Sequence, residues 1–177
     1  MRIIFLDVDG VLNSINTKDR LRGFIGIDEK CVKYLKDIID ATDAKIVLSS
    51  TWRLCRHGCE DELYQYLEKR LKEYNIEIMD WTPTSPVRYR GTEIQGWFKD
   101  NQDLDIESFI ILDDDSDLKP YGRRHVQTSF YKAGLEQKHV TKAIKMLGEE
   151  CKPWFEDIDL FFTDAAVEDY LAQNRQV

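Results

Sequence analysis

Short runs of consecutive apolar residues alternate along the chain with longer segments in which apolar residues recur every three or four positions. The runs predict four strands and a weaker fifth, at Ile3–Leu6, Ile46–Leu48, Ile76–Met79, Phe109–Leu112 and His125–Ser129. They are continuously apolar rather than alternating, which favours strands covered on both faces, as in a parallel sheet.

Four helices are expected between and after these strands. The first begins after Asp28 as N-cap, the second spans about Glu60–Tyr74, the third carries the capping-box pattern Thr92-x-x-Gln95, and the fourth ends at Gly148. The alternation predicts an α/β fold, a Rossmann-like three-layer structure with a parallel sheet. In such folds the functional site lies beyond the carboxyl ends of the strands.

Composition agrees with a folded globular protein, since 42% of the 177 residues are hydrophobic and 33% are charged. One domain is expected at this length. No apolar run approaches the ~20 residues of a membrane span, and the first residues read as a core strand rather than a signal peptide. The four cysteines lack the spacing of a disulfide framework. We expect a cytoplasmic protein with no membrane contact, and favour a monomer while leaving the oligomeric state open.

The net charge of −8 is concentrated at the C-terminus. Residues 149–177 hold eight acidic and two basic residues, a net charge of −6, so that residues 1–148 carry only −2. This balance argues against loose binding to nucleic acid or anionic membranes, which depends on an excess of Lys and Arg. The aromatic residues of the acidic segment predict an extension packed on the core, with a short helix at Asp164–Ala172. An arm that binds a partner is the alternative.

Two carboxylates follow the first predicted strand directly, in the sequence Asp7-Val8-Asp9-Gly10-Val11-Leu12. A second acidic cluster, Asp113-Asp114-Asp115-x-Asp117, follows the fourth. If these strands are neighbours the two clusters meet, and a cation is needed between the like charges. Magnesium binds one or two carboxylates together with phosphate oxygens, so Mg²⁺ is the expected cofactor. The sequence leaves open which of Asp113, Asp114 and Asp117 binds it.

The second predicted strand ends in hydroxyl groups, Ser49-Ser50-Thr51. At the carboxyl edge of a sheet such hydroxyls can donate to a phosphate oxygen, although serines also commonly cap the following helix. The aromatic residues Trp81 and Tyr89 flank a proline-containing loop, where they can stack on a base or belong to the core.

These motifs together resemble the haloacid dehalogenase superfamily of phosphatases. Its first motif, D-x-D-G-x-L/T, matches Asp7–Leu12, its second matches Ser49, and its fourth matches Asp113-Asp114. More narrowly, the chain is similar to the small domain of this type in RNA-repair proteins and, distantly, to the phosphatase domain of polynucleotide kinase-phosphatases. The short sequence segments that support this similarity are SSTWR at 49–53, TP at 82–83, RGTEI at 90–94 with Trp97, and AGL at 133–135. The resemblance covers residues 1–148 and leaves 149–177 as the acidic extension.

The resemblance implies a role for each candidate residue. Asp7 is the nucleophile and a metal ligand, and Asp9 is the general acid and base, with its backbone carbonyl on the metal. Asp113 or Asp114 completes the Mg²⁺ site. Phosphate contacts are expected from a wider set of residues, namely Gly10, Ser49, Ser50 and Arg90. Arg88 and Lys99 remain alternatives to Arg90 as the catalytic cation.

The expected activity is hydrolysis of a phosphomonoester through an aspartyl-phosphate. A small-metabolite phosphatase or a phosphotransferase is the alternative among enzymes, and a receiver-like domain that binds Mg²⁺ and accepts phosphate without turnover is the alternative outside them. A signalling phosphoacceptor has no need of Asp9. The resemblance favours a nucleotide or nucleic-acid-end phosphate as substrate. The intervals around the motifs are too short for a large lid, so a minimal cap and an open site are expected.

Overall fold

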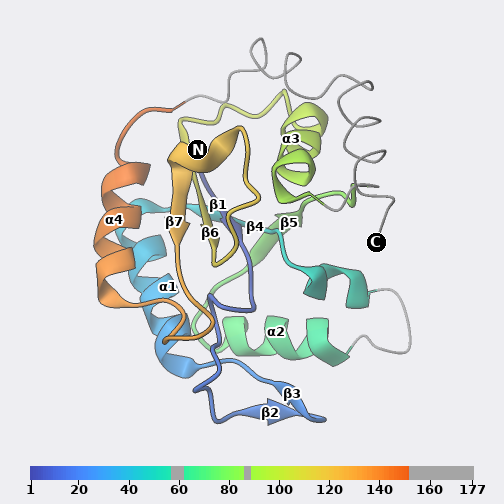
Figure 1. Ribbon diagram of the computed structural model, residues 1–177. Helices are drawn as coiled ribbons and strands as arrows, with labels where there is room; N and C mark the ends of the chain where they lie inside the picture. Colours follow the sequence, from blue (N-terminus) through green and yellow to red (C-terminus); the bar gives the residue numbers. More distant parts are fainter. Residues whose placement is uncertain (57–61, 86–88, 152–177) are drawn as a thin grey trace.

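The computed structural model describes residues 1–56, 62–85 and 89–151. At its centre lies a five-stranded sheet (Figure 1). The strands, in spatial order, are β5 (Ile78–Trp81), β4 (Lys45–Leu48), β1 (Arg2–Leu6), β6 (Ser108–Asp113) and β7 (His125–Gln127). Each neighbouring pair is parallel. The predicted parallel sheet is confirmed.

Helices cover both faces of the sheet because successive residues of each strand point to opposite sides. Ile4 and Leu6 of β1 belong to a core formed with α1 (Glu29–Thr42), α2 (Glu62–Lys72) and α4 (Gln137–Leu147). Their neighbours Ile3 and Phe5 belong to a second core, formed with α3 (Arg90–Asp100). The three-layer α/β architecture follows (Figure 1).

Two helix ends agree with the sequence prediction. Asp28 is the N-cap of α1, where its carboxylate accepts a hydrogen bond from the backbone N–H of Lys30 at 2.9 Å. Gly148 is the C-cap of α4, and its N–H donates to the carbonyl of Ile144 at 3.0 Å. Its φ of −77° is right-handed, so this glycine ends the helix without adopting the left-handed conformation.

The boundaries of β5 and α3 differ from the prediction. The apolar run from Ile76 predicts a strand two residues too early, because Ile76 closes the turn after α2 by donating to the carbonyl of Leu71. The capping box at Thr92 is wrong. Helix α3 begins at Arg90 after Tyr89, and Thr92 lies within it.

A small hairpin between β1 and α1 has no counterpart in the prediction. Strands β2 (Arg20–Leu21) and β3 (Phe24–Ile25) pair antiparallel at the bottom of Figure 1. Their two-residue turn requires positive φ at Arg22 and Gly23, the pattern of a tight hairpin. This hairpin is the main insertion between β1 and α1, so the interval holds no lid domain.

The described chain ends beside the amino edge of the sheet. The N–H of Cys151 donates to the carbonyl of Glu107 at 2.8 Å. The remainder of the predicted acidic extension, including a short helix expected at Asp164–Ala172, lies outside the described residues. A boundary at residue 148 and the packing of the extension on the core therefore stay predictions. Among the described residues, no helix has the length and apolar character needed to cross a membrane.

The N-terminus of α3 is pressed against the loop that follows β6. A Cβ atom on Gly91 would lie 2.0 Å from the carbonyl oxygen of Lys119, a contact with backbone that no rotamer change relieves. The same helix end is held by two hydrogen bonds to Asp117. Its carboxylate accepts from the N–H of Arg90 and its carbonyl from the N–H of Gly91, both at 3.1 Å. Asp117 therefore positions the helix from a distant part of the chain.

Gly91→Ala tests this close approach. Alanine is the better helix former by about 1 kcal/mol, but the contact with Lys119 outweighs that gain, and we expect a net loss of ~1–3 kcal/mol in the free energy of unfolding. Urea denaturation measures it. Gly122→Ala is the control, since a Cβ atom there meets nothing within 4 Å. A Gly91→Ala protein as stable as the unsubstituted chain would contradict the close packing.

Candidate active site

Acidic side chains from two neighbouring strands meet at the carboxyl edge of the sheet. Asp7 follows β1 and Asp113 ends β6, and the N–H of Asp7 donates to the carbonyl of Leu112 at 2.9 Å. Asp7, Asp113 and Asp114 each offer a carboxylate oxygen, and these three atoms lie within 4.8 Å of one another. Asp7 is 6% exposed and Asp113 is 1% exposed. The structure thus brings together the two clusters that the sequence places after separate strands.

Burial opposes the ionisation of this cluster. It raises the pKa of Asp7, against the lowering effect of Arg90. It also raises the pKa of Asp113, with a further contribution from the charge of Asp7. The pKa of Asp114 is raised by burial and by the neighbouring charge of Asp115. The ionised cluster therefore needs positive charge close by.

Arg90, the first residue of α3, supplies such a charge. Its Nη2 lies 3.3 Å from Oδ1 of Asp7, and its Nε lies 3.1 Å from Oδ2 of Asp113. Burial works against the Arg90 charge, but the surrounding carboxylates, of which Asp7 and Asp113 contribute most, together outweigh it and raise the pKa of Arg90. Oδ2 of Asp113 is buried and, among the described residues, accepts no hydrogen bond of good geometry. The ion pair with Arg90 is thus the main interaction of this acceptor.

The alternatives that the sequence left open lie elsewhere. Lys99 is exposed and sits nine residues after Arg90 on α3, roughly 13 Å along the helix axis. Arg88 lies outside the described residues. Asp117 does not belong to the group of three carboxylates, and its side chain accepts the hydrogen bond from the N–H of Arg90. The geometry favours Arg90 as the cation and Asp113 and Asp114 as the acids of the second cluster.

Asp9 is exposed and does not belong to this group of three, although its charge contributes to raising the pKa of Asp7 and of Asp114. Its Oδ1 accepts from Nδ2 of Asn13 at 2.8 Å, and its Oδ2 accepts from Nε1 of Trp52 at 2.9 Å. No sequence pattern predicts either donor, since Asn13 has no assigned role and Trp52 enters only as part of the segment SSTWR. Trp52 is buried, at 5% exposed, and still reaches Asp9 with its indole N–H. The two aspartates of the first motif therefore have different surroundings.

The hydroxyl residues after β4 lie beside Asp7. The side chain of Ser50 hydrogen-bonds to Asp7 and lowers the pKa of that carboxyl. Ser49 is fully buried, and its hydroxyl has no hydrogen-bond partner in the part of the chain that the structure describes. An unsatisfied hydroxyl at the end of a central strand is costly unless a ligand uses it. Its position suits a donor to a bound oxyanion.

Gly10 is a turn residue with φ of +77°. Its N–H donates to Oδ1 of Asn13 at 3.0 Å, so this donor is engaged within the loop. A Cβ atom at this position would lie 2.3 Å from Cγ of Asp114. Glycine here gives the second acidic cluster room to approach the first, while a direct phosphate contact from Gly10 stays a prediction.

A buried arginine connects the loop after β4 with α3. Arg53 is 3% exposed and pairs with Glu93 of α3 at 2.8 Å. It also donates to three backbone carbonyls, those of Ser50 (2.6 Å), Thr82 (2.9 Å) and Pro83 (3.3 Å). Burial lowers the pKa of Arg53 while Glu93 raises it, and burial has the larger effect. This clamp fixes Ser50 relative to the helix that carries Arg90.

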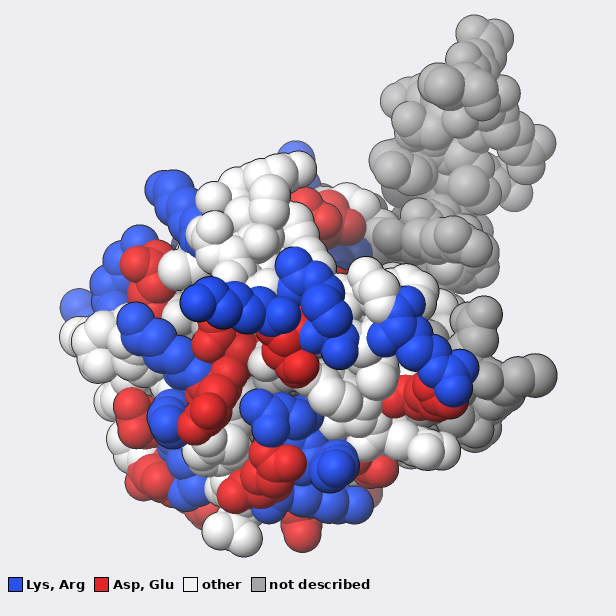
Figure 2. All heavy atoms as spheres, turned by 90° about the horizontal axis from the view of Figure 1, so that it is seen from below, with Lys and Arg blue, Asp and Glu red and all other residues white. Residues whose placement is uncertain are grey.

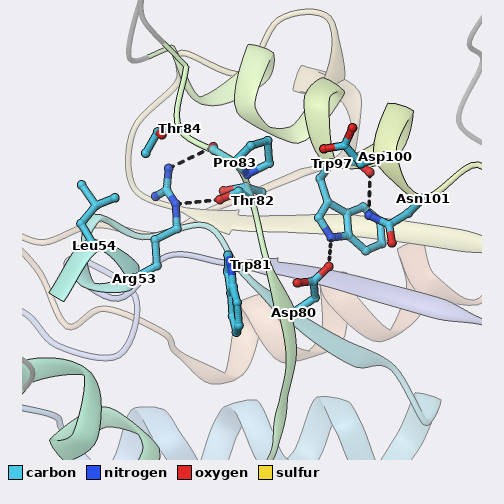
Figure 3. Close-up of a pocket in the computed structure, with 10 residues that line it drawn as sticks. All are labelled: Arg53, Leu54, Asp80, Trp81, Thr82, Pro83, Thr84, Trp97, Asp100 and Asn101. Carbon is cyan, nitrogen blue, oxygen red and sulfur yellow. Dashed lines mark hydrogen bonds between the residues drawn. The ribbon is translucent and has the colours of Figure 1, made fainter. Parts of the chain in front are cut away.

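Beyond the clamp lies an open cavity of about 510 Å³ (Figure 3). Trp81, Pro83 and Leu54 contribute apolar surface to its wall. Two aspartates also line it, and one of them, Asp80, accepts a hydrogen bond from Nε1 of Trp97 at 2.6 Å. Trp81, one of the two aromatic residues considered for base stacking, thus lines a cavity. The other, Tyr89, instead accepts a hydrogen bond through its hydroxyl from the N–H of Lys119.

The model of one protein family matches residues 3–140, most of the chain. Its description is the HAD domain in Swiss Army Knife RNA repair proteins. The chain belongs to this family. The haloacid dehalogenase (HAD) resemblance seen in the motifs is thereby confirmed. Searches of the curated proteins and of the solved structures give no match. Membership supports a phosphatase-type hydrolase with phosphorylated substrates.

The residues of this HAD domain fit a hard divalent cation. Three carboxylate oxygens lie within 4.8 Å of one another, and Oδ2 of buried Asp113 accepts no hydrogen bond of good geometry from the described residues. Magnesium prefers oxygen ligands and commonly keeps water or substrate oxygens in its remaining positions. Asp7, Asp113 and Asp114 are the side chains that would hold it.

Removal of the Arg53 charge tests the clamp. Arg53→Gln leaves buried Glu93 with only the more distant Arg90, at 4.0 Å, and we expect a loss of about 3 kcal/mol in the free energy of unfolding by chemical denaturation. Replacing both partners, Arg53→Met with Glu93→Leu, should recover much of it, because no charge is then buried alone. Lys33→Gln, which removes an exposed pair with Glu29, is the control and should change little. Equal effects of Arg53→Gln and Lys33→Gln would contradict the clamp.

Proposed function

We propose that the chain is a Mg²⁺-dependent phosphomonoesterase that works through an aspartyl-phosphate on Asp7. The observation that carries this proposal is the different surroundings of two aspartates two residues apart. Asp7 lies in a buried group of carboxylates beside Arg90, whereas Asp9 is exposed and held by neutral donors. The first environment suits a nucleophile that is activated by a nearby metal ion and guanidinium, and the second leaves a carboxyl group accessible to substrate and water.

In the first step, a carboxylate oxygen of Asp7 attacks phosphorus and the bond from phosphorus to the ester oxygen breaks. Asp9 gives its proton to the leaving oxygen. In the second step, Asp9 takes a proton from water, whose oxygen attacks phosphorus, and the bond between phosphorus and Asp7 breaks to release phosphate. Asp9 is then protonated for the next cycle. The two steps replace one difficult hydrolysis with two easier displacements.

Charge stabilisation comes from the groups around Asp7. Arg90 can donate to oxygens of the transferring phosphoryl group, and the unpartnered hydroxyl of Ser49 is available for the same purpose. Bound Mg²⁺ would neutralise the carboxylate and phosphate charges, with Asp7, Asp113 and Asp114 as its side-chain ligands and the backbone carbonyl of Asp9 as a further one. The clamp formed by Arg53 holds the loop after β4, which carries Ser49 and Ser50, in a fixed position relative to α3, which carries Arg90.

We propose a nucleotide or a nucleic-acid end as the source of the phosphate. The family description, which names RNA repair proteins, supports this choice. The charge distribution on the surface favours contact with a nucleotide or the end of a strand rather than with a long duplex. On the face seen in Figure 2, basic and acidic side chains are interspersed, and the whole chain carries a net charge of −8. A long duplex is bound mainly through its phosphate charges, and such binding needs an excess of Lys and Arg that this surface does not have.

Substitution of the two aspartates separates their roles. Asp7→Asn should form no covalent phosphoenzyme, because an amide is not a nucleophile. Asp9→Asn should accumulate phosphoenzyme from an aryl phosphate, whose leaving group needs little protonation, because attack by water slows by ~10²–10⁴. Rapid-quench labelling with Mg²⁺ should show hydroxylamine-sensitive label on Asp9→Asn alone. Equal labelling of both variants would remove Asp7 as nucleophile, and no label or turnover in any variant would refute the proposed function.

The pKa shifts predict how metal binding depends on pH. Burial raises the folded-state pKa of Asp7 and Asp113 above their ordinary values, so the stability that these groups contribute is complete below those values and lost as pH rises through the raised ones. The melting temperature in the presence of a chelator should therefore fall between about pH 5 and about pH 8. Added Mg²⁺ should raise it more at the higher pH, because the ionised carboxylates bind the cation.

Thermal denaturation with and without Mg²⁺ at both pH values measures the difference. An effect of ~1 kcal/mol corresponds to about 2–4 °C for a chain of this size. Asp113→Asn is the matched control, since it should flatten the dependence on pH and reduce the effect of Mg²⁺. An effect of Mg²⁺ that is the same at both pH values would count against the carboxylate group as its binding site.

A further inference from the structure

Each carboxylate oxygen of Asp9 has its own neutral N–H donor. Asn13 Nδ2 lies 2.8 Å from Oδ1, and Trp52 Nε1 lies 2.9 Å from Oδ2. Asn13 comes from the loop that follows Asp9, whereas Trp52 comes from the 3-10 helix Thr51–Arg56 after β4. Asp9 is exposed, so water competes for both oxygens. Two donors from different parts of the chain thus define one orientation of a side chain that is otherwise free to rotate.

The donors are themselves fixed by burial. Asn13 is fully buried, and its Oδ1 accepts from the N–H of Gly10 at 3.0 Å. A rotated Asn13 amide would place donor against donor at Gly10, so its Nδ2 is held toward Asp9. Trp52 is 5% exposed, and its ring cannot move without opening the core. The orientation of Asp9 is therefore imposed by rigid surroundings.

Asp9 lies outside the group formed by Asp7, Asp113 and Asp114, although its charge acts on Asp7 and Asp114. Its two hydrogen bonds to Asn13 and Trp52 give it an orientation that does not depend on that group. Trp52 also connects Asp9 with Ser49 and Ser50, which immediately precede the 3-10 helix. The proton-transfer group is thus attached to the segment expected to bind phosphate.

We propose that Asn13 and Trp52 are positioning residues that hold Asp9 in the orientation required for proton transfer. This inference rests on the proposed function. Neither residue reacts, since Asn13 and Trp52 act only through Asp9. A carboxylate that is displaced by about 1 Å from its productive position loses ~10²-fold in rate. The loss falls on the step that needs the proton and spares steps that do not.

Leaving-group dependence distinguishes positioning from general damage. We expect Trp52→Phe and Asn13→Ala to lower kcat/KM for an alkyl phosphate by about 10- to 100-fold relative to p-nitrophenyl phosphate, whose leaving group needs little protonation. Trp97→Phe is the matched control. It also removes an indole N–H donor from an aspartate, Asp80, and should leave the ratio of the two substrates unchanged. An unchanged ratio in both Trp52→Phe and Asn13→Ala would overturn the inference.

A double substitution tests whether Trp52 acts through Asp9. In an Asp9→Asn background, Trp52→Phe should produce no further fall in the alkyl-to-aryl ratio, because the group that it positions is already lost. Losses that multiply would overturn the inference. If Asp9→Asn itself leaves the ratio unchanged, the proposed role of Asp9 fails, and the positioning role fails with it.

The contact itself has a readout independent of activity. In the ¹H–¹⁵N spectrum of the full chain, the Trp52 indole resonance, assigned by its absence in Trp52→Phe, should shift on Asp9→Asn while the Trp97 resonance stays in place. A Trp52 resonance that does not move would overturn the inference even in an active phosphatase. A shift in a chain that hydrolyses neither substrate would refute the proposed function, and with it a role in proton transfer, while leaving the contact intact.

Discussion

The repulsion between Asp7 and Asp113 is the constraint on which the rest of the site depends. Two carboxylates buried at the ends of adjacent strands need a positive charge, and Arg90 reaches both of them from the first turn of α3. Asp117 fixes the start of that helix and so places the guanidinium beside the two carboxylates. Gly91 lets α3 approach the loop after β6, and the pair of Arg53 with Glu93 ties the same helix to the loop after β4. The edge of the sheet is in this sense organised around one guanidinium.

Much of the fold is predictable from the sequence because it follows from local patterns. Buried central strands give unbroken apolar runs, and the N-cap of α1 is a single residue at its expected position. Two features were not predicted correctly, the first because it depends on a residue distant in sequence and the second because its strands are very short. The start of α3 depends on Asp117, which is distant in sequence. The hairpin of β2 and β3 has strands of only two residues, too short to produce an alternating pattern.

The candidate site divides in the same way. Asp7, Asp9 and the acids after β6 are recognisable because a strand followed by carboxylates has few structural explanations. The role of Arg90 was predicted from the family resemblance, whereas its position beside Asp7 results from tertiary packing. No sequence pattern indicates the contacts of Asn13 and Trp52 with Asp9. An asparagine in a loop and a buried tryptophan are ordinary residues until the chain folds, and only then do their N–H groups meet Asp9.

The position of Asp117 affects how an alanine scan of the acidic run 113–117 must be interpreted. Asp117 contacts α3 rather than the group of three carboxylates, and it accepts the hydrogen bond from the N–H of the residue that supplies the guanidinium. Its truncation would release the end of α3 and move Arg90, so the variant would lose activity much as a ligand variant does. Inactivation alone therefore does not identify a metal ligand here. A ligand is distinguished by a change in cation preference, which a displaced helix end has no reason to cause.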